Sequence, residues 1–175
     1  MNLYFRLLIT LLRCWRLPRF SVGSTLTRKF HVLPNDLDLN GHMNNGRYHT
    51  IIDLMIVEYF VRVGFAEAVM RKGWRPMSGG SVMTYRRGLK PFATYTLHFR
   101  LEACDAQWNY MRFEFRDGER LCAAGYMKGA VVGRGGFVPN SESYAALGQP
   151  VPDATLPVAV AHWLQAEQAL IEQPW

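Results

Sequence analysis

The longest hydrophobic pattern in the chain runs over residues 45–63 and has the period of a helix. Apolar side chains recur there three or four positions apart, at Tyr48, Ile52, Met55, Ile56, Tyr59 and Val63, which is the spacing of one helical face. Most of the remaining circumference is apolar too, so this helix is expected inside a fold or at a subunit contact. At about 1.5 Å per residue it spans roughly 28 Å. The pattern therefore predicts a central helix that ends at Gly64 and is wrapped by other elements.

Alternating apolar and polar positions predict strands on both sides of this helix. One strand precedes it, over residues 25–33, and four follow it, over residues 81–87, 95–103, 108–116 and 121–132. Asp117-Gly118 is a strong hairpin signal, and strands joined by short turns pair antiparallel by default. A loop is predicted at Gly79-Gly80. The sequence thus divides into a basic segment (1–22), one domain (23–138) and a tail (139–175) whose last helix starts near Pro157 and lies across the outside.

Residues 1–20 combine apolar side chains with arginines. On a helical wheel the apolar side holds Tyr4, Leu7, Leu8, Leu11 and Trp15, and the opposite side holds Arg6, Arg13 and Arg16. The uninterrupted apolar run is too short for a spanning helix, which needs about 20 residues, and a clear small-residue cleavage site is lacking. The pattern predicts an amphipathic basic helix. It either lies on an anionic membrane surface or docks on its own domain.

The charge of the chain is concentrated in this first segment. The net charge is +6, from 20 Lys and Arg against 14 Asp and Glu. Residues 1–30 contain six of the basic residues and no acid, so the remainder is balanced at 14 of each sign. A neutral body is not a nucleic-acid surface of the usual kind. The three cysteines, Cys14, Cys104 and Cys122, are widely spaced and form no CxxC pair, so we expect buried reduced thiols in a cytosolic protein rather than disulfides or a zinc site.

The stretch before the central helix is dense in hydrogen-bonding side chains. We call residues 33–48, LPNDLDLNGHMNNGRY, the hook. Asp38, Asn40 and His42 alternate, so an extended backbone would point all three to one side. Asn44 or Asn45 is the natural N-cap of the helix. A polar connection that leads into the start of a buried helix suggests a catalytic site.

The hook also carries a family signature. Residues 38–48 resemble the D-x-N-x-H-x-N-N-x-x-Y motif of thioesterases of the 4-hydroxybenzoyl-CoA thioesterase and plant acyl-ACP thioesterase type. The resemblance implies an α+β hotdog fold, a long central helix wrapped by an antiparallel sheet of about five strands. It makes Asp38 the catalytic carboxylate, with Asn40 and His42 taking part as in the plant-type enzymes. Those relatives carry a Glu after a Tyr-Arg-Arg triplet, whereas Gly88 follows Tyr85-Arg86-Arg87 here, so the plant-type mechanism cannot be carried over whole.

Thioester hydrolysis gives these residues definite roles. A carboxylate can attack the carbonyl and form a mixed anhydride, or it can activate a water. The backbone amides of Asn45 and Gly46, at the positive end of the helix dipole, would stabilise the oxyanion. Tyr48, Arg86 and Arg87 are predicted substrate contacts, the arginines with the phosphates of CoA or phosphopantetheine. No metal or further cofactor is needed, because CoA or phosphopantetheine belongs to the substrate.

Other interpretations of these residues stay open. Asp38 can be a turn residue that caps backbone amides, His42 a structural histidine, and Arg86 and Arg87 a solvated strand end. Asp53 and Glu58, inside the helix pattern, face a partner subunit or a pocket.

The alternative function is a non-catalytic acyl-binding or membrane-peripheral hotdog module, and a hydratase on the same fold is a third hypothesis. For the favoured acyl-CoA or acyl-carrier-protein thioesterase we expect a homodimer or homotetramer. It would bind no nucleic acid, and it would be cytoplasmic, with peripheral contact at the inner membrane surface through residues 1–20.

Overall fold

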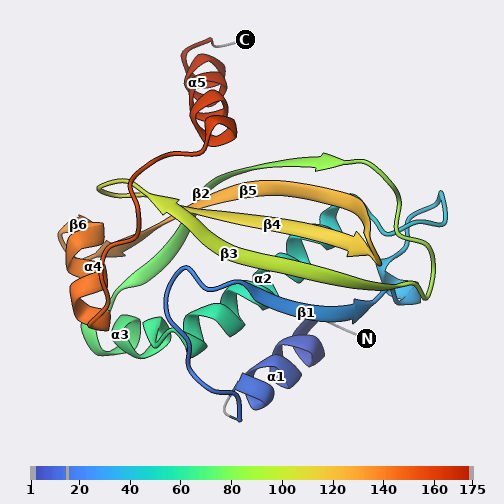
Figure 1. Ribbon diagram of the computed structural model, residues 1–175, viewed down its shortest axis with the longest axis horizontal. Coiled ribbons are helices and arrows are strands. Elements are labelled where there is room, and N and C mark those ends of the chain that lie inside the picture. Colours follow the sequence, from blue (N-terminus) through green and yellow to red (C-terminus); the bar gives the residue numbers. More distant parts are fainter. Residues whose placement is uncertain (1–2, 15, 174–175) are drawn as a thin grey trace.

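One antiparallel sheet organises the molecule. The computed structural model describes residues 3–14 and 16–173, and its strands lie in the order β1-β3-β4-β5-β2, with the short β6 paired to the end of β5 (Figure 1). All pairings are antiparallel. The strands are β1 (Leu26–His31), β2 (Arg75–Tyr85), β3 (Thr94–Cys104), β4 (Asn109–Asp117), β5 (Arg120–Gly133) and β6 (Gly136–Val138).

The predicted central helix is α2 (Asn45–Arg62), which lies against one face of this sheet (Figure 1). It begins at the N-cap Asn44, whose side chain accepts a hydrogen bond from the backbone N–H of Gly46. It ends before Gly64, which adopts the left-handed conformation (φ +83°) that favours glycine. A long helix wrapped by an antiparallel sheet of five main strands confirms the predicted α+β hotdog fold.

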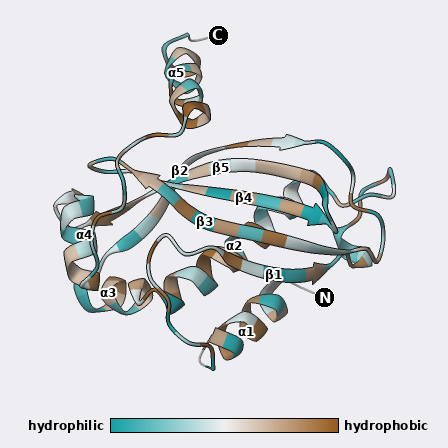
Figure 2. Ribbon diagram, in the orientation of Figure 1, coloured by the Kyte–Doolittle hydropathy of each residue, from teal (hydrophilic) through white to brown (hydrophobic). Residues whose placement is uncertain are grey.

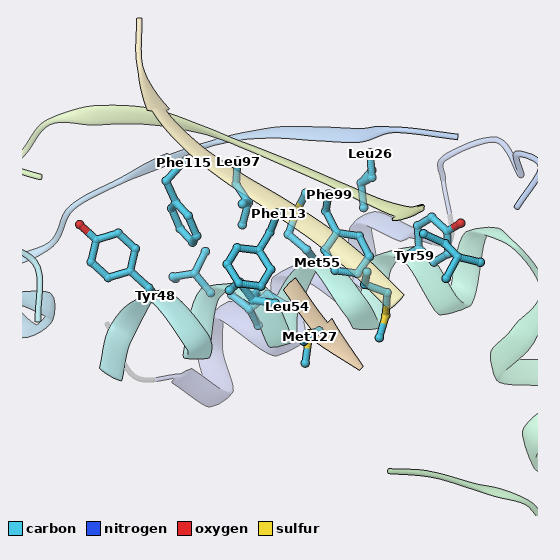
Figure 3. Packing of buried hydrophobic residues seen from close by; sticks show 14 of the residues in the cluster. Leu26, Tyr48, Leu54, Met55, Tyr59, Leu97, Phe99, Phe113, Phe115 and Met127 are labelled. Atoms are coloured by element: carbon cyan, nitrogen blue, oxygen red, sulfur yellow. The ribbon is translucent and has the colours of Figure 1, made fainter. Parts of the chain in front are cut away.

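The core fills the space between α2 and the sheet. Aromatic side chains of the strands meet those of the helix edge to face, with ring centroids 4.8 Å apart for Tyr48 and Phe115 and 5.5 Å apart for Tyr59 and Phe99 (Figure 3). Phe113 and Leu97 are fully buried between them. Each such side chain contributes roughly 1.5–3 kcal/mol when it leaves water, so this layer fixes the position of α2 and of the hook that precedes it.

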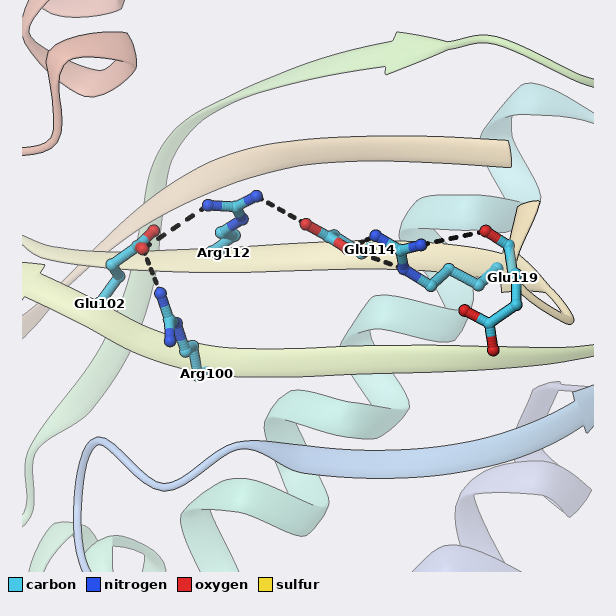
Figure 4. A network of polar contacts seen from close by, with 6 residues as sticks. Arg100, Glu102, Arg112, Glu114 and Glu119 are labelled. Atoms are coloured by element: carbon cyan, nitrogen blue, oxygen red, sulfur yellow. Dashed lines mark hydrogen bonds and ion pairs between the residues drawn. The ribbon is translucent and has the colours of Figure 1, made fainter. Parts of the chain in front are cut away.

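The other face of the sheet is largely polar. Arg100, Glu102, Arg112 and Glu114 form a network of ion pairs along β3 and β4 (Figure 4). At one end of this face, α5 (Val158–Glu172) starts after Pro157 as predicted and buries Val160 in a small apolar cluster. Trp163 and Leu164 join this cluster and Glu167 pairs with Lys128 of β5, so the helix lies on the outer face as expected. Only its C-terminal end, with exposed Leu170 and Ile171, projects from the body (Figure 2).

Four elements of the described residues were not predicted, and β2 differs most from its predicted extent. The unpredicted elements are helices α3 (Phe65–Lys72) and α4 (Asn140–Leu147), strand β6 and a 3₁₀ turn, η1 (Pro34–Asp36). Strand β2 starts at Arg75, so the predicted loop at Gly79-Gly80 is wrong. Those glycines lie inside the strand, at an irregularity in its pairing with β5 between Ser78 and Gly80. A Cβ on Gly79 would lie 2.2 Å from the Trp108 ring, so the close approach of that ring requires glycine.

The first helix, α1 (Leu3–Cys14), packs against α2. Its buried side chains include Arg6 and Thr10, whereas Leu8 and Leu11, on the predicted apolar side, are exposed. Trp15 lies outside the described residues. None of the helices in the described ranges is long and apolar enough to cross a bilayer. Cys14, Cys104 and Cys122 are free and buried, as predicted.

Candidate active site

The hook folds into a tight loop. Leu37 and Met43 form an isolated β-bridge, the backbone N–H of Asp38 donates to the carbonyl of His42 (2.9 Å), and Gly41 donates back to the carbonyl of Asp38 (3.1 Å). Gly41 has a φ of +71°, which requires glycine at the tip of the turn. The extended backbone that would align Asp38, Asn40 and His42 is therefore absent, and a turn sets their geometry.

The carboxylate of Asp38 faces the inside of this turn. Its Oδ1 accepts hydrogen bonds from the backbone N–H groups of Asn40 (2.9 Å) and His42 (3.3 Å). These contacts are those of an aspartate that caps a turn, and they also hold the carboxylate in one orientation. Asp38 is half-buried, whereas Asn40 and His42 are exposed.

The first turn of α2 is capped by its own side chains. Asn44 Oδ1 accepts from the Gly46 amide at 2.9 Å, so this predicted oxyanion donor already has a partner. The Tyr85 hydroxyl, from the end of β2, donates to the carbonyl of Asn45 at 3.3 Å. An oxyanion at Gly46 would have to displace the Asn44 cap, and the Asn45 amide stays a prediction.

Gly88, the position at which the plant-type enzymes have an acid, lies against His42. A Cβ on Gly88 would be 2.6 Å from Cδ2 of the His42 imidazole. The imidazole therefore occupies the space that any side chain at position 88 would enter. With His42 in this position, Gly88 leaves the room that the imidazole fills.

The other predicted contacts divide between core and surface. Tyr48 is only 1% exposed and packs under Tyr85 with ring centroids 5.1 Å apart. Burial raises the pKa of Tyr48 to about 12, and this placement favours a packing role over substrate contact. Arg86 and Arg87 are exposed, and both backbone N–H groups donate to the carbonyl of Cys122. They follow Tyr85 directly and thus lie at the end of the sheet where the hook is.

Asp36, itself part of the hook, stabilises it through buried contacts. It is 1% exposed, its Oδ2 accepts from Arg6 (2.5 Å) and from the backbone of Leu33 (3.0 Å), and its carbonyl accepts from the Asn44 amide. In the thioesterases that the hook resembles an Asp is common at this position, two residues before the catalytic one, where it is expected to support the turn, and these bonds agree with that role. The sequence did not suggest Arg6 as a partner, because the wheel placed that arginine on a polar outer side.

A second feature, an apolar cavity of about 240 Å³, lies between the later half of α2 and the sheet. Its lining includes Ile56 and Phe60 of α2, Met77 of β2 and Met127 of β5, with Asp53 as the charged residue. Burial raises the pKa of Asp53, and the nearby His49 opposes this rise. Asp53 lies eight residues after Asn45, about 12 Å farther along the axis. Within one chain, hook and cavity therefore lie at different positions along α2.

Asp53 and Glu58, the two acids inside the helix pattern, lie in different environments. Asp53 faces the cavity, as one of the two alternatives proposed for it, whereas Glu58 is 1% exposed and pairs with Arg28 and Arg62. In the described part of the chain, no three His, Cys, Asp or Glu side chains gather at a spacing that would hold a metal ion.

Comparison with known proteins decides the family. The model of the thioesterase-like superfamily matches residues 32–164, which hold the hook, α2 and strands β2 to β6. The chain belongs to the thioesterase-like superfamily. The prediction of a thioester hydrolase is thus confirmed at the level of the family.

Individual members of known sequence or structure are distant. Protein THEM6 of Xenopus laevis is 28% identical over 144 residues, which cover 81% of this chain and 68% of that protein. A Staphylococcus aureus protein solved in complex with CoA superposes with a TM-score of 0.64 at 14% identity, covering 82% of this chain and 96% of its own. A 1,4-dihydroxy-2-naphthoyl-CoA thioesterase from Synechocystis superposes with a TM-score of 0.62 at 9% identity. The match covers 71% of this chain and 95% of that protein. At these identities the two structures establish a shared fold.

Proposed function

We propose that this member of the thioesterase-like superfamily hydrolyses acyl-CoA or acyl-carrier-protein thioesters, with Asp38 as the reacting carboxylate. The observation that carries the proposal is the placement of Asp38, whose Oδ1 is fixed by two backbone amides immediately before the start of a buried helix. A carboxylate held in one orientation on the loop that leads into a helix N-terminus suits attack on a carbonyl whose oxygen becomes negative and would be stabilised by the helix dipole.

In the proposed reaction, Asp38 either attacks the thioester carbon or removes a proton from a water that attacks it. The first route expels the thiolate, which takes a proton from water, and leaves a mixed anhydride for hydrolysis. The second gives the free acid directly. Asn40 and His42, exposed on the same loop, would orient the water or the carbonyl. Arg86 and Arg87 would meet the phosphates of the carrier.

We assign the acyl group to the apolar cavity. An apolar cavity of about 150 Å³ accepts benzene, so 240 Å³ suits one substituted ring or a chain of about eight carbons. The hook and the cavity are separated along α2. A thioester whose carbonyl is bound at the hook of one copy would therefore place its acyl group in the cavity of a second copy. The hotdog resemblance, which implies sites at subunit interfaces, supports this arrangement. Two fold relatives, a gentisyl-coenzyme A thioesterase and a 1,4-dihydroxy-2-naphthoyl-CoA thioesterase, act on CoA thioesters.

The test is thiol release from a panel of short, medium, long and aromatic acyl-CoAs. Asp38→Asn keeps an oxygen that can accept both backbone hydrogen bonds, so it removes the charge while preserving the turn. We expect its kcat to fall by about 10²–10⁴-fold, with a medium-length or aromatic substrate preferred by the wild type. Asp117→Asn, in the exposed hairpin turn, is the matched control and should retain full activity. Turnover by Asp38→Asn equal to that of the wild type would refute the proposal.

A non-catalytic acyl-binding module is the second candidate. The Asp38 carboxylate already accepts a hydrogen bond that stabilises the loop, and the Gly46 amide already donates one that caps the helix. Isothermal titration with CoA separates the two functions. Binding together with thiol release at background level, in wild type and Asp38→Asn alike, would favour the module.

A further inference from the structure

Helix α1 is docked with its polar side inward. The side chains that it buries are Arg6, Thr10 and Cys14, spaced four residues apart on one helical face. The outward side is apolar, with six side chains between 41% and 76% exposed: Tyr4, Phe5, Leu8, Ile9, Leu11 and Leu12. We call these six residues the α1 apolar face. Contiguous exposed apolar surface of this kind marks an interaction site.

Buried ion pairs fix this orientation. Arg6 pairs with Asp36, and the Thr10 hydroxyl accepts from Arg28, which in turn pairs with Glu58. Asp36 and Glu58 are each 1% exposed. If the helix rolled to bury its apolar side, Asp36 would lose Arg6 and keep only Arg47, 3.8 Å away, and breaking a buried ion pair costs several kcal/mol. The exposure of the α1 apolar face is therefore built into the fold.

The charges around the α1 apolar face indicate which kind of partner binds there. Arg13 and Arg16 are exposed, neither makes a salt bridge with another described residue, and residues 1–30 contain no acid. Exposed Arg19 follows, paired with Glu67. Two copies joined through this face would bring four unneutralised arginines together. Anionic lipid headgroups would neutralise them, with each basic side chain near the surface adding to the attraction.

We propose that the α1 apolar face docks on an anionic lipid bilayer, with α1 lying in the plane of the interface and its arginines against the headgroups. The hook would then lie close to the membrane, because Arg6 of α1 holds Asp36, two residues before Asp38. This docking does not depend on the chemistry assigned to Asp38.

The experiment is co-sedimentation of the full chain with vesicles of phosphatidylcholine, alone or with about 30 mol % phosphatidylglycerol. We expect binding to the anionic vesicles that weakens in high salt. Leu8→Glu/Leu12→Glu should bind at least tenfold more weakly, and Arg13→Glu/Arg16→Glu should lose the preference for anionic lipid. The matched control is Leu170→Glu/Ile171→Glu, which places the same charges on the exposed end of α5 and should bind like the wild type.

Several results would overturn the proposal. They are wild-type protein that stays in the supernatant, equal binding to both kinds of vesicle, or unchanged binding by Leu8→Glu/Leu12→Glu. A lipid-free oligomer that dissociates in Leu8→Glu/Leu12→Glu would assign the face to a second copy instead. All substituted positions are exposed, so thermal unfolding should match the wild type. Point substitutions are preferred to deleting α1, because deletion would leave Asp36 buried without Arg6.

Discussion

At the scale of single residues, the contact between Gly88 and His42 gives the sharpest test of the hook. In Gly88→Ala the new Cβ would fall 2.6 Å from the imidazole, so His42 must move. If His42 orients water or substrate, kcat/KM should fall by about tenfold or more, since a shift of about 1 Å in a positioning group can cost as much as 10²-fold. Steady-state kinetics measures this.

The matched control for that variant is Gly135→Ala. A Cβ at Gly135 meets nothing within 4 Å, and its backbone needs no glycine. It should keep both activity and thermal stability. Full activity in Gly88→Ala, with the melting temperature unchanged, would assign His42 a structural role.

Site residues could be predicted from the sequence where their geometry is local. The N-cap Asn44, the turn role of Asp36 and the grouping around Asp38 depend on neighbours within a few positions. The burial of Arg6 depends on Asp36, thirty residues away, and that of Tyr48 depends on Tyr85 and Phe115. Such contacts are set by the tertiary packing, so no helical wheel or motif contains them.

At the scale of elements, the attachment of α1 to the hook can be measured. Arg6→Met removes one member of a buried ion pair and leaves Asp36 with Arg47, whose Nε is 3.8 Å away. We expect the free energy of unfolding to fall by about 3 kcal/mol, measured by urea denaturation. Arg13→Met, an exposed arginine on the same helix, should change it by less than about 0.5 kcal/mol.

A double-mutant cycle completes that test. Adding Asp36→Asn to Arg6→Met removes the buried charge that would otherwise have only Arg47 near it, and keeps an oxygen for the Leu33 amide. The double variant should therefore lose less stability than the two single losses added together. Strict additivity would show that Arg6 and Asp36 do not interact.

The outer face of β3 and β4 gives a prediction about pH. Burial alone would raise the pKa of Glu114, but hydrogen bonds from Arg116 and Arg112 outweigh it and hold the pKa below its ordinary 4.5. A carboxyl whose pKa is lowered on folding stabilises the protein above its unfolded pKa, and this contribution is lost as the pH falls through the folded value.

Glu114→Gln should therefore be less stable than the wild type by about 0.5–1 kcal/mol at pH 7, since the pairs are partly exposed. The difference should shrink below pH 4.5 and in high salt. Urea denaturation at pH 7 and pH 3 measures it, with Glu119→Gln as the control, because Glu119 meets Arg116 only through its backbone carbonyl. A difference that does not change with pH would contradict the assigned pKa shift.

Whether an element could be predicted depended on its length and on the regularity of its pattern. The central helix and strands β3, β4 and β5 repeat their pattern over nine or more residues, and their predicted bounds were close. Helices α3 and α4 have eight residues each, and glycines interrupt β2. Gly79 packs against Trp108, which lies far away in the sequence, in the connection between β3 and β4, so a loop was the natural prediction from the sequence.

At the scale of the whole molecule, β2 leaves the sheet with an open edge. It is the last strand in the order, eleven residues long, with exposed side chains over most of its length. A long open edge is a template for pairing with another chain. The hotdog resemblance implies that two copies pair their sheets, and we expect this pairing at β2. Antiparallel pairing of β2 with β2 about a two-fold axis would also run the two α2 helices antiparallel.

This pairing is expected to complete the site. With the two α2 helices antiparallel, the hook at the start of one helix lies toward the cavity beside the later half of the other. The dimer would thus bring together the hook and the cavity, which are separated within one chain.

Val82→Lys puts a charge on the edge strand, where lysine opposes pairing. We expect this variant to elute as a monomer in size-exclusion chromatography with light scattering and to lose thiol release. Val158→Lys, on the exposed start of α5, should stay dimeric and active. A monomeric Val82→Lys with full activity would show that one chain holds a complete site, and the acyl group would then have to bind outside the cavity.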